Sequence, residues 1–209
     1  MACLASPVPA CDTALLLAVD ESGSIDPDEY VLETTGLANA LESPDILEAL
    51  VRGQVALTLV HWSGVGKQRI SLPWARMTTP EDVAIFADAA RALKRPREYS
   101  DTAIGEAVRF SLRQFDEVGD CDQQVIDVSG DGRENANRSL PQARAEAEAL
   151  GVTVNAIAIE INETSHDLSL YFQERVITSD GFVETALGTA DYPRAIKAKL
   201  LRELTKPVS

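Results

Sequence analysis

Three side chains with hard oxygen ligands alternate along one short loop near the start of the chain. Asp20, Ser22 and Ser24 occupy every second position, which lets their oxygens point the same way. Carboxylate and hydroxyl oxygens suit Mg²⁺, Mn²⁺ or Ca²⁺ better than zinc or copper. Because Ser, Asp and Gly are also common in any loop before a helix, these residues alone equally fit a capped turn without metal.

The loop lies between two elements that the sequence predicts clearly. The apolar run Thr13–Val19 before it is typical of a strand covered on both faces, as in a parallel sheet. After it, Asp26, Pro27 and Glu29 give a helix cap, a proline at the first helical position and a capping-box acid. The loop is therefore expected to be held at both ends.

Two later segments place similar groups at equivalent points. Thr102 adds a hydroxyl near the start of another helix, and Asp131 follows the strand expected over Gln123–Val128. Strand ends at the carboxyl edge of an open parallel sheet converge where ligands bind. The sequence therefore predicts that Thr102 and Asp131 meet the first loop at one edge of the sheet.

Strands and helices alternate along the rest of the chain. Further strands are expected over Gln54–Trp62, Val152–Ile159 and Gly181–Val183, with Lys67–Leu72 as an antiparallel edge strand. Helices are expected over Pro27–Leu41, Pro44–Val51, Thr79–Leu93, Thr102–Phe115, Ser139–Leu150, His166–Val176 and Asp191–Leu204. This alternation predicts an α/β fold with a doubly wound, mainly parallel central sheet and helices on both faces.

The three polar segments together resemble the von Willebrand factor A-type domain with its metal-ion-dependent adhesion site (MIDAS). The resemblance covers the chain from about Thr13 to Leu204. It implies that Ser22, Ser24 and Thr102 coordinate Mg²⁺, with Mn²⁺ or Ca²⁺ as alternatives, and that Asp20 and Asp131 act mostly through water. The wording of the motifs looks like one bacterial subfamily of exported proteins whose function is unassigned.

Two departures from the family pattern concern the site. Ser129–Gly132 reads S-G-D-G where most such domains read T-D-G, which affects the pose of Asp131. Asp101 stands where a glycine usually precedes the threonine. Since aspartate is among the best helix caps, we expect Asp101 to cap the helix that begins at Thr102 rather than to bind metal.

The resemblance implies a module that binds another protein through the metal, without enzymatic activity. A partner's Asp or Glu carboxylate would complete the octahedron of the ion. The alternative is a metal-dependent phosphoester hydrolase that uses Asp20 and Asp131. Such enzymes carry a second acid where this chain has Ser22, and no G-x-S-x-G elbow accompanies His61, so binding is favoured over turnover.

The resemblance also implies that two cysteines lie side by side. Cys11 and Cys121 precede strands that are parallel neighbours in A-type topology, at the edge opposite the metal. A disulfide there indicates an oxidising compartment, and hence an exported, periplasmic or secreted protein. Reduced thiols remain an alternative, as does lipidation of Cys11. No signal sequence is recognised, since Met1–Ala10 lacks a basic start and an apolar run.

Composition bounds these hypotheses. With 209 residues, 45% of them hydrophobic, the chain predicts one domain over residues 13–204, an extension over 1–12 and a tail over 205–209. The net charge of −14 argues against nucleic acid as a partner, and no stretch has the length of a transmembrane helix. Asp127 interrupts an apolar strand and is expected to have a buried basic partner.

Overall fold

The computed structural model describes residues 11–95, 101–161 and 166–205. Their strands form one six-stranded sheet. The strand order is β3-β2-β1-β4-β5-β6, and only the β2–β3 pair is antiparallel. The predicted doubly wound, mainly parallel sheet with an antiparallel edge is confirmed. Its strands are β1 (Thr13–Asp20), β2 (Ala56–Trp62), β3 (Gln68–Arg76), β4 (Gln123–Gly130), β5 (Thr153–Glu160) and β6 (Val183–Leu187).

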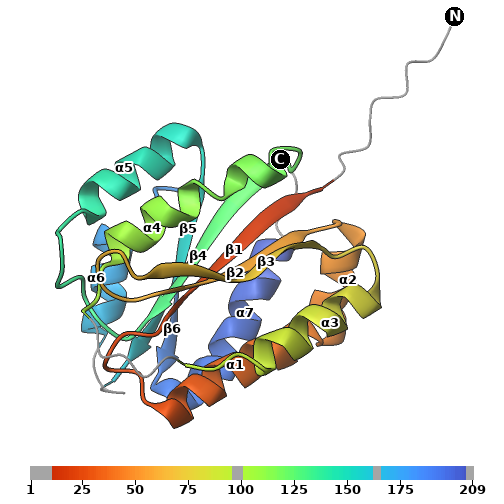
Figure 1. The fold of residues 1–209 in the computed structure, drawn as a ribbon, viewed down its shortest axis with the longest axis horizontal. Helices are drawn as coiled ribbons and strands as arrows, with labels where there is room; N and C mark the ends of the chain where they lie inside the picture. The colour runs from red at the N-terminus through yellow and green to blue at the C-terminus, as the bar shows by residue number, and fades with distance from the viewer. Residues whose placement is uncertain (1–10, 96–100, 162–165, 206–209) are drawn as a thin grey trace, which may run out of the picture.

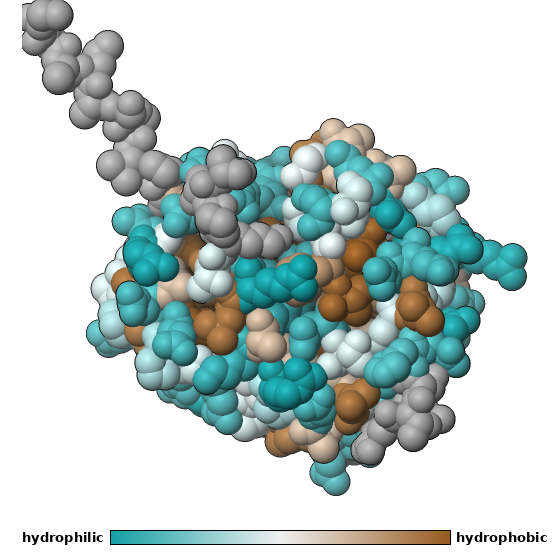
Figure 2. Space-filling model, turned by 180° about the vertical axis from the view of Figure 1, so that it is seen from behind, coloured by the Kyte–Doolittle hydropathy of each residue, from teal (hydrophilic) through white to brown (hydrophobic). Residues whose placement is uncertain are grey.

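Helices cover both faces of the sheet (Figure 1). One face carries α1 (Pro27–Leu41), α2 (Pro44–Arg52), α3 (Pro80–Arg91) and α7 (Tyr192–Leu204). The other carries α4 (Ile104–Leu112), α5 (Leu140–Leu150) and α6 (Asp167–Arg175). Short 3₁₀ turns lie at Phe115–Val118 and Thr189–Asp191. On the side shown in Figure 2, the remaining apolar side chains reach the surface in separate patches among polar ones.

Strand β1 shows why a central strand of this fold is apolar throughout. All eight of its residues are buried. Leu15 and Leu17 pack into the core under α1 and α7, whereas Ala14 and Leu16 pack into the core under α4 and α5. A strand covered on both faces loses the alternation of polar and apolar residues that a half-exposed strand shows.

The caps that delimit the first loop are confirmed. The Asp26 carboxylate accepts hydrogen bonds from the backbone N–H groups of Asp28 and Glu29 at 2.8 and 2.9 Å. The Glu29 carboxylate accepts in turn from the backbone of Asp26 at 2.8 Å. Because this capping box fixes where α1 begins, it also fixes the end of the loop that follows β1.

The prediction that Asp101 caps a helix starting at Thr102 is wrong. Helix α4 begins at Ile104, its N-cap residue is Ala103, and Asp101 is exposed before it. The Thr102 carbonyl accepts hydrogen bonds from the backbone of Asn135 and Ala136, at 3.0 and 3.3 Å. This carbonyl is thereby engaged by a separate loop and not by the next turn of a helix.

Two strand boundaries also differ from expectation. Strand β3 continues past Leu72 and through Pro73 to Arg76, which an edge strand tolerates because it needs no donor on its outer side. Strand β6 begins at Val183, where the predicted strand was to end. A Cβ atom on Gly181 would lie 2.2 Å from the Val154 carbonyl oxygen, so Gly181 makes a close backbone approach before the strand instead of belonging to it.

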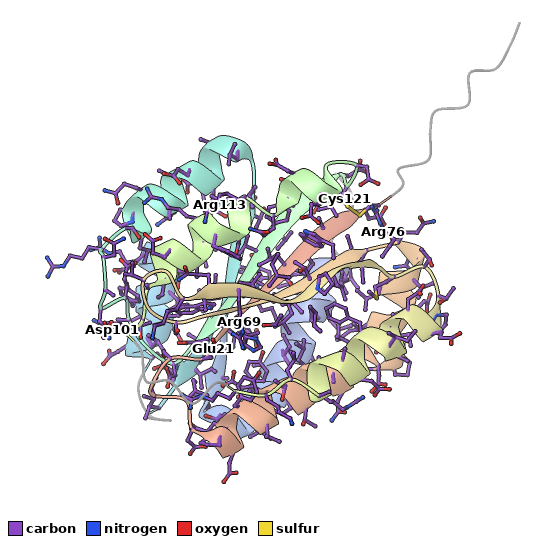
Figure 3. The ribbon with its side chains drawn as sticks, in the orientation of Figure 1. Glu21, Arg69, Arg76, Asp101, Arg113 and Cys121 are labelled. Atoms are coloured by element: carbon purple, nitrogen blue, oxygen red, sulfur yellow. A yellow bond between two sulfur atoms is a disulfide. The ribbon has the colours of Figure 1, made fainter. Side chains whose placement is uncertain are left out.

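Cys11 and Cys121 form a disulfide, as the resemblance implied. They precede β1 and β4, which pair in parallel from Thr13 opposite Gln123. In Figure 3, Cys121 lies at one end of the sheet and Asp101 at the other. The structure therefore carries the disulfide itself, and neither reduced thiols nor a lipid on Cys11. Among the residues described, no helix is both long and apolar enough to cross a membrane.

Candidate metal centre

Four of the five predicted site residues are linked by hydrogen bonds at the carboxyl ends of β1 and β4. Asp20, the last residue of β1, accepts from the backbone N–H of Ser22 at 2.7 Å. The hydroxyl oxygens of Ser22 and Ser24 lie 3.3 Å apart. The Ser24 hydroxyl donates to Asp131 at 2.6 Å, across 107 positions of sequence. The two strand ends are therefore joined through hydroxyl groups.

Thr102, the fifth predicted residue, approaches from a different element. It lines the same open pocket of about 680 Å³ as Ser22 and Ser24. Its Oγ1 lies 3.5 Å from the position that a Cβ atom on Gly132 would occupy, so the segment of Thr102 lies beside the residue that follows Asp131. The structure brings all five predicted residues to one edge of the sheet.

Asp20 has an unsatisfied carboxylate oxygen. The residue is fully buried, and within the described part of the chain its Oδ2 has no hydrogen-bond partner. Burial, and then the charge of Asp131, raise the pKa of Asp20 to about 8. A Cβ on Gly130 would lie 3.1 Å from Oδ2, so that glycine leaves space beside the oxygen. A buried acceptor of this kind fits an ion or an ion-bound water.

Asp131 is the second acid of the site and is also mostly buried. Burial, and to a smaller extent the charge of Glu29, raise the pKa of Asp131, while the hydrogen bond from Ser24 lowers it. Among the described residues, no three His, Cys, Asp or Glu side chains gather as a metal site. Any ion here would rest on hydroxyls as much as on the two acids, a donor set that suits hard cations.

Asn135 contributes to the site although no sequence pattern selects it. Its side-chain oxygen accepts from the Thr102 N–H at 2.9 Å, and its own N–H donates to the Thr102 carbonyl at 3.0 Å. These two bonds hold Thr102 against the loop that carries Asp131. A single asparagine in a polar loop has no distinguishing pattern, so only the structure could identify it.

Glu134 and Gly105 fix the helices around the site. The Glu134 carboxylate accepts from the backbone N–H groups of Gly105 and Leu140, at 2.9 and 3.3 Å, at the starts of α4 and α5. A Cβ on Gly105 would come within 2.4 Å of the Ser139 hydroxyl oxygen. Gly105 therefore lets the two helix starts touch, which explains a glycine inside α4.

Two arginines hold the first loop from the outside. Arg95 donates to the Ser22 carbonyl at 2.8 Å. Arg69 of β3 forms an ion pair with Glu21 at 2.6 Å, and Figure 3 shows the two side chains next to each other. Arg95 thus binds the backbone of a candidate ligand, and Arg69 binds the residue next to one. Both hold the loop from outside the pocket.

His61 and Asp127, which the sequence also singles out, are buried and do not line the pocket. His61 is fully buried, with Nδ1 2.6 Å from the Ser71 hydroxyl and Nε2 3.1 Å from the Tyr30 hydroxyl. Burial lowers the pKa of His61 to about 3, so its ring is neutral near pH 7. The basic partner predicted for Asp127 is Lys199 of α7.

The fold and its strand order define a von Willebrand factor A-like domain. The chain is similar to a von Willebrand factor type A structure from Catenulispora acidiphila, with 15% identity and a TM-score of 0.68 over 95% of this chain and 44% of that one. It is similar to proximal thread matrix protein 1 from the mussel byssus with a zinc-occupied MIDAS motif, with 19% identity, a TM-score of 0.67 and coverage of 93% and 48%. It is also similar to manganese-loaded TRAP protein of Plasmodium vivax, with 17% identity and a TM-score of 0.60 over 94% of this chain and 74% of that one.

The chain itself belongs to the family described as "Protein of unknown function (DUF1194)", whose pattern matches residues 10–208. This agrees with the resemblance to a subfamily of unassigned function. No curated protein sequence matches the chain. The chain spans about half the length of the mussel and Catenulispora proteins. At identities of 15 to 19% these structures establish the fold alone.

Proposed function

We propose that the protein is a divalent-metal-dependent module for binding another protein. The observation that carries the proposal is the buried Oδ2 of Asp20, which has no partner among the described residues and lies in the loop whose serines line an open pocket. A buried acceptor without a partner destabilises a fold by about 1–3 kcal/mol. A cation bound nearby would remove that penalty, and the pocket would leave the cation accessible to a partner.

In this proposal Ser22, Ser24 and Thr102 hold the ion directly, and Asp20 and Asp131 act through water. Neutral hydroxyls leave a divalent ion incompletely neutralised, so a partner's Asp or Glu carboxylate can take its open position. The zinc and manganese of the mussel and Plasmodium structures support a divalent cation. For this chain we propose Mg²⁺, with Mn²⁺ and Ca²⁺ as alternatives.

The first experiment concerns the metal. Asp131→Ala should abolish Mg²⁺ binding, as measured by titration calorimetry, while circular dichroism shows a persisting fold. Asp116→Ala is the control, because Asp116 is an exposed acid in the 3₁₀ turn Phe115–Val118, outside the pocket. Unchanged Mg²⁺ affinity in Asp131→Ala would show that the site is assigned to the wrong residues.

The second experiment concerns the partner. Capture of a partner from a native extract should fail in EDTA and in the Ser22→Ala, Ser24→Ala double variant. Attraction by surface charge alone would instead give capture that falls with salt and ignores the chelator. That second pattern would contradict a metal-mediated interaction.

The alternative function is a metal-dependent phosphoester hydrolase built on Asp20 and Asp131. Two observations favour binding over turnover: Ser22 stands where a second acid would be expected, and His61 is buried and neutral. Turnover of a phosphoester with Mg²⁺ or Mn²⁺, lost in Asp20→Asn, would favour the hydrolase and remove the binding proposal.

We further propose that the protein is exported and that residues 13–204 form its domain. The support for export is the Cys11–Cys121 disulfide, because such bonds persist in oxidising compartments. Mass spectrometry of unreduced protein made in an oxidising compartment should find the two cysteines bridged. Two freely alkylatable thiols at these positions would remove the main support for export.

A further inference from the structure

The turn between β2 and β3 forms one wall of the candidate pocket. The Ser63 N–H donates to the Lys67 carbonyl at 3.2 Å, and the Lys67 N–H donates to the Gly64 carbonyl at 3.1 Å. The Gln68 side chain donates to the same carbonyl at 2.9 Å. Gly66 adopts a φ of +70°, which a glycine reaches without strain. The turn is therefore closed by its own hydrogen bonds.

The same turn is attached to two of the segments that carry candidate metal ligands. The Glu21 N–H donates to the Trp62 carbonyl at 2.9 Å, which ties the turn to the loop of Ser22 and Ser24. The Ala103 N–H donates to the Ser63 carbonyl at 2.9 Å, which ties it to Thr102. The tip of the turn therefore keeps a fixed place beside any ion bound by these hydroxyls.

Val65 occupies that tip, and its side chain is 54% exposed although it is a β-branched aliphatic group. It lines the pocket together with Ser22, Ser24 and Lys67. A single exposed apolar residue is ordinary on a protein surface. This one differs because a rigid turn presents it at a polar pocket. Lys67 and Asp101 line the same pocket, so charged groups of both signs lie around the exposed Val65.

We propose that Val65 is a specificity-determining residue, and that the partner is a protein segment in which an aliphatic residue flanks the metal-binding Asp or Glu. This inference rests on the proposed function. In the bound partner, the Cα atom of the next residue lies about 3.8 Å from the Cα atom of the metal-binding Asp or Glu. That residue meets the wall of the pocket, where Val65 offers apolar surface to bury.

The test uses synthetic seven-residue peptides on an array, each with one central Glu. In one set both flanking residues are Leu, and in the other both are Ser. With Mg²⁺, the wild-type protein should retain the Leu set about fivefold more than the Ser set, the ratio expected for partly burying one aliphatic side chain. EDTA should abolish retention of both sets. Val65→Ser should remove the preference for Leu while its Mg²⁺ affinity stays unchanged.

Ile85→Ser is the matched control, since Ile85 is a 63% exposed aliphatic residue on α3 that does not line the pocket; it should keep the fivefold preference. Equal, EDTA-sensitive retention of both peptide sets would overturn the role of Val65 and leave the metal-dependent function standing. Retention of neither set in Mg²⁺, or retention that ignores EDTA, would overturn both.

Discussion

Asp20 and Asp127 are buried carboxylates on neighbouring parallel strands, and their surroundings differ. Burial raises the pKa of both above the ordinary value, that of Asp20 to about 8. Asp127 forms an ion pair with Lys199, which is itself fully buried and lies 2.6 Å from the Glu203 carboxylate. The Asn155 side chain donates to the same Glu203 oxygen at 2.6 Å. This cluster carries its own cation.

The edge with Asp20 has acids without such a cation. In the described part of the chain, neither Asp20, Asp131 nor Glu33 forms an ion pair with a basic side chain. Glu33 of α1 is buried with both carboxylate oxygens unpartnered there. Its burial, and then the charges of Asp20 and Asp131, raise its pKa well above the ordinary value. The comparison shows that a buried lysine lies against Asp127, whereas the described residues give Asp20, Asp131 and Glu33 no such partner. Under the proposed function, a bound divalent cation would take that place.

The largest expected effect comes from removing the internal cation. Lys199→Met keeps most of the side-chain volume but leaves Asp127 and Glu203 buried together without a positive charge. Breaking a buried ion pair in this way lowers the free energy of unfolding by about 3–5 kcal/mol. Urea denaturation at pH 7 measures the loss.

Lys197→Met on the same helix is the control, because Lys197 is exposed. It should change stability by less than about 0.5 kcal/mol. If the two variants had equal stabilities, Lys199 would not neutralise Asp127, and the contrast between the two clusters would disappear.

The fold was predictable because its signals are local and repeated. Apolar runs such as Thr13–Val19 mark fully buried strands, and the Asp26 and Glu29 capping box marks a helix start. The predictions failed where a long-range contact decides a boundary. Thr102 is held outside α4 by Asn135, 33 positions away, and Gly181 is placed by the Val154 carbonyl. No local pattern records either contact.

The candidate site was predictable to the level of residue types, since its acids and serines lie at or just after strand ends and Thr102 lies just before a helix. Whether Mg²⁺ binds these five residues stays a prediction. The groups that fix their positions were missed for a physical reason. Arg95 acts on a backbone carbonyl of Ser22 from 73 positions away, and Glu134 caps two helices at once. Backbone acceptors and donors have no side-chain signature, so such partners become visible only in three dimensions.

A smaller effect is expected from His61, whose burial makes the stability depend on pH in the opposite sense to the buried acids. Its pKa is lowered from 6.5 to about 3, so the folded state holds the ring neutral while the unfolded state takes up a proton below pH 6.5. The stability it contributes is therefore present above pH 6.5 and is lost as the pH falls toward 3. At pH 5 the loss is about 2 kcal/mol.

The acids with raised pKa values change stability with pH in the opposite direction. The contribution of His61 is therefore measured as the difference between the pH profiles of wild type and a His61 variant. Denaturation of wild type and His61→Gln between pH 7 and pH 5 should show a steeper loss in the wild type. Parallel pH profiles would mean that His61 takes up its proton in the folded state as well, contrary to its burial between Tyr30 and Ser71.

The smallest expected effect tests the comparison most directly, because one chemical change should act with opposite signs in the two clusters. Asp20→Asn keeps an oxygen to accept from the Ser22 N–H but removes a buried carboxyl whose pKa is raised to about 8, and a raised pKa of this kind disfavours the folded state near pH 7. The metal-free protein should become more stable, by up to about 1 kcal/mol, and Mg²⁺ should no longer raise its melting temperature. Asp127→Asn should instead destabilise the protein, because it weakens the pairing of buried Lys199. Thermal melts with and without Mg²⁺ decide the point: if Asp20→Asn destabilised the metal-free protein as Asp127→Asn does, Asp20 would have a cation of its own and no need of an external one.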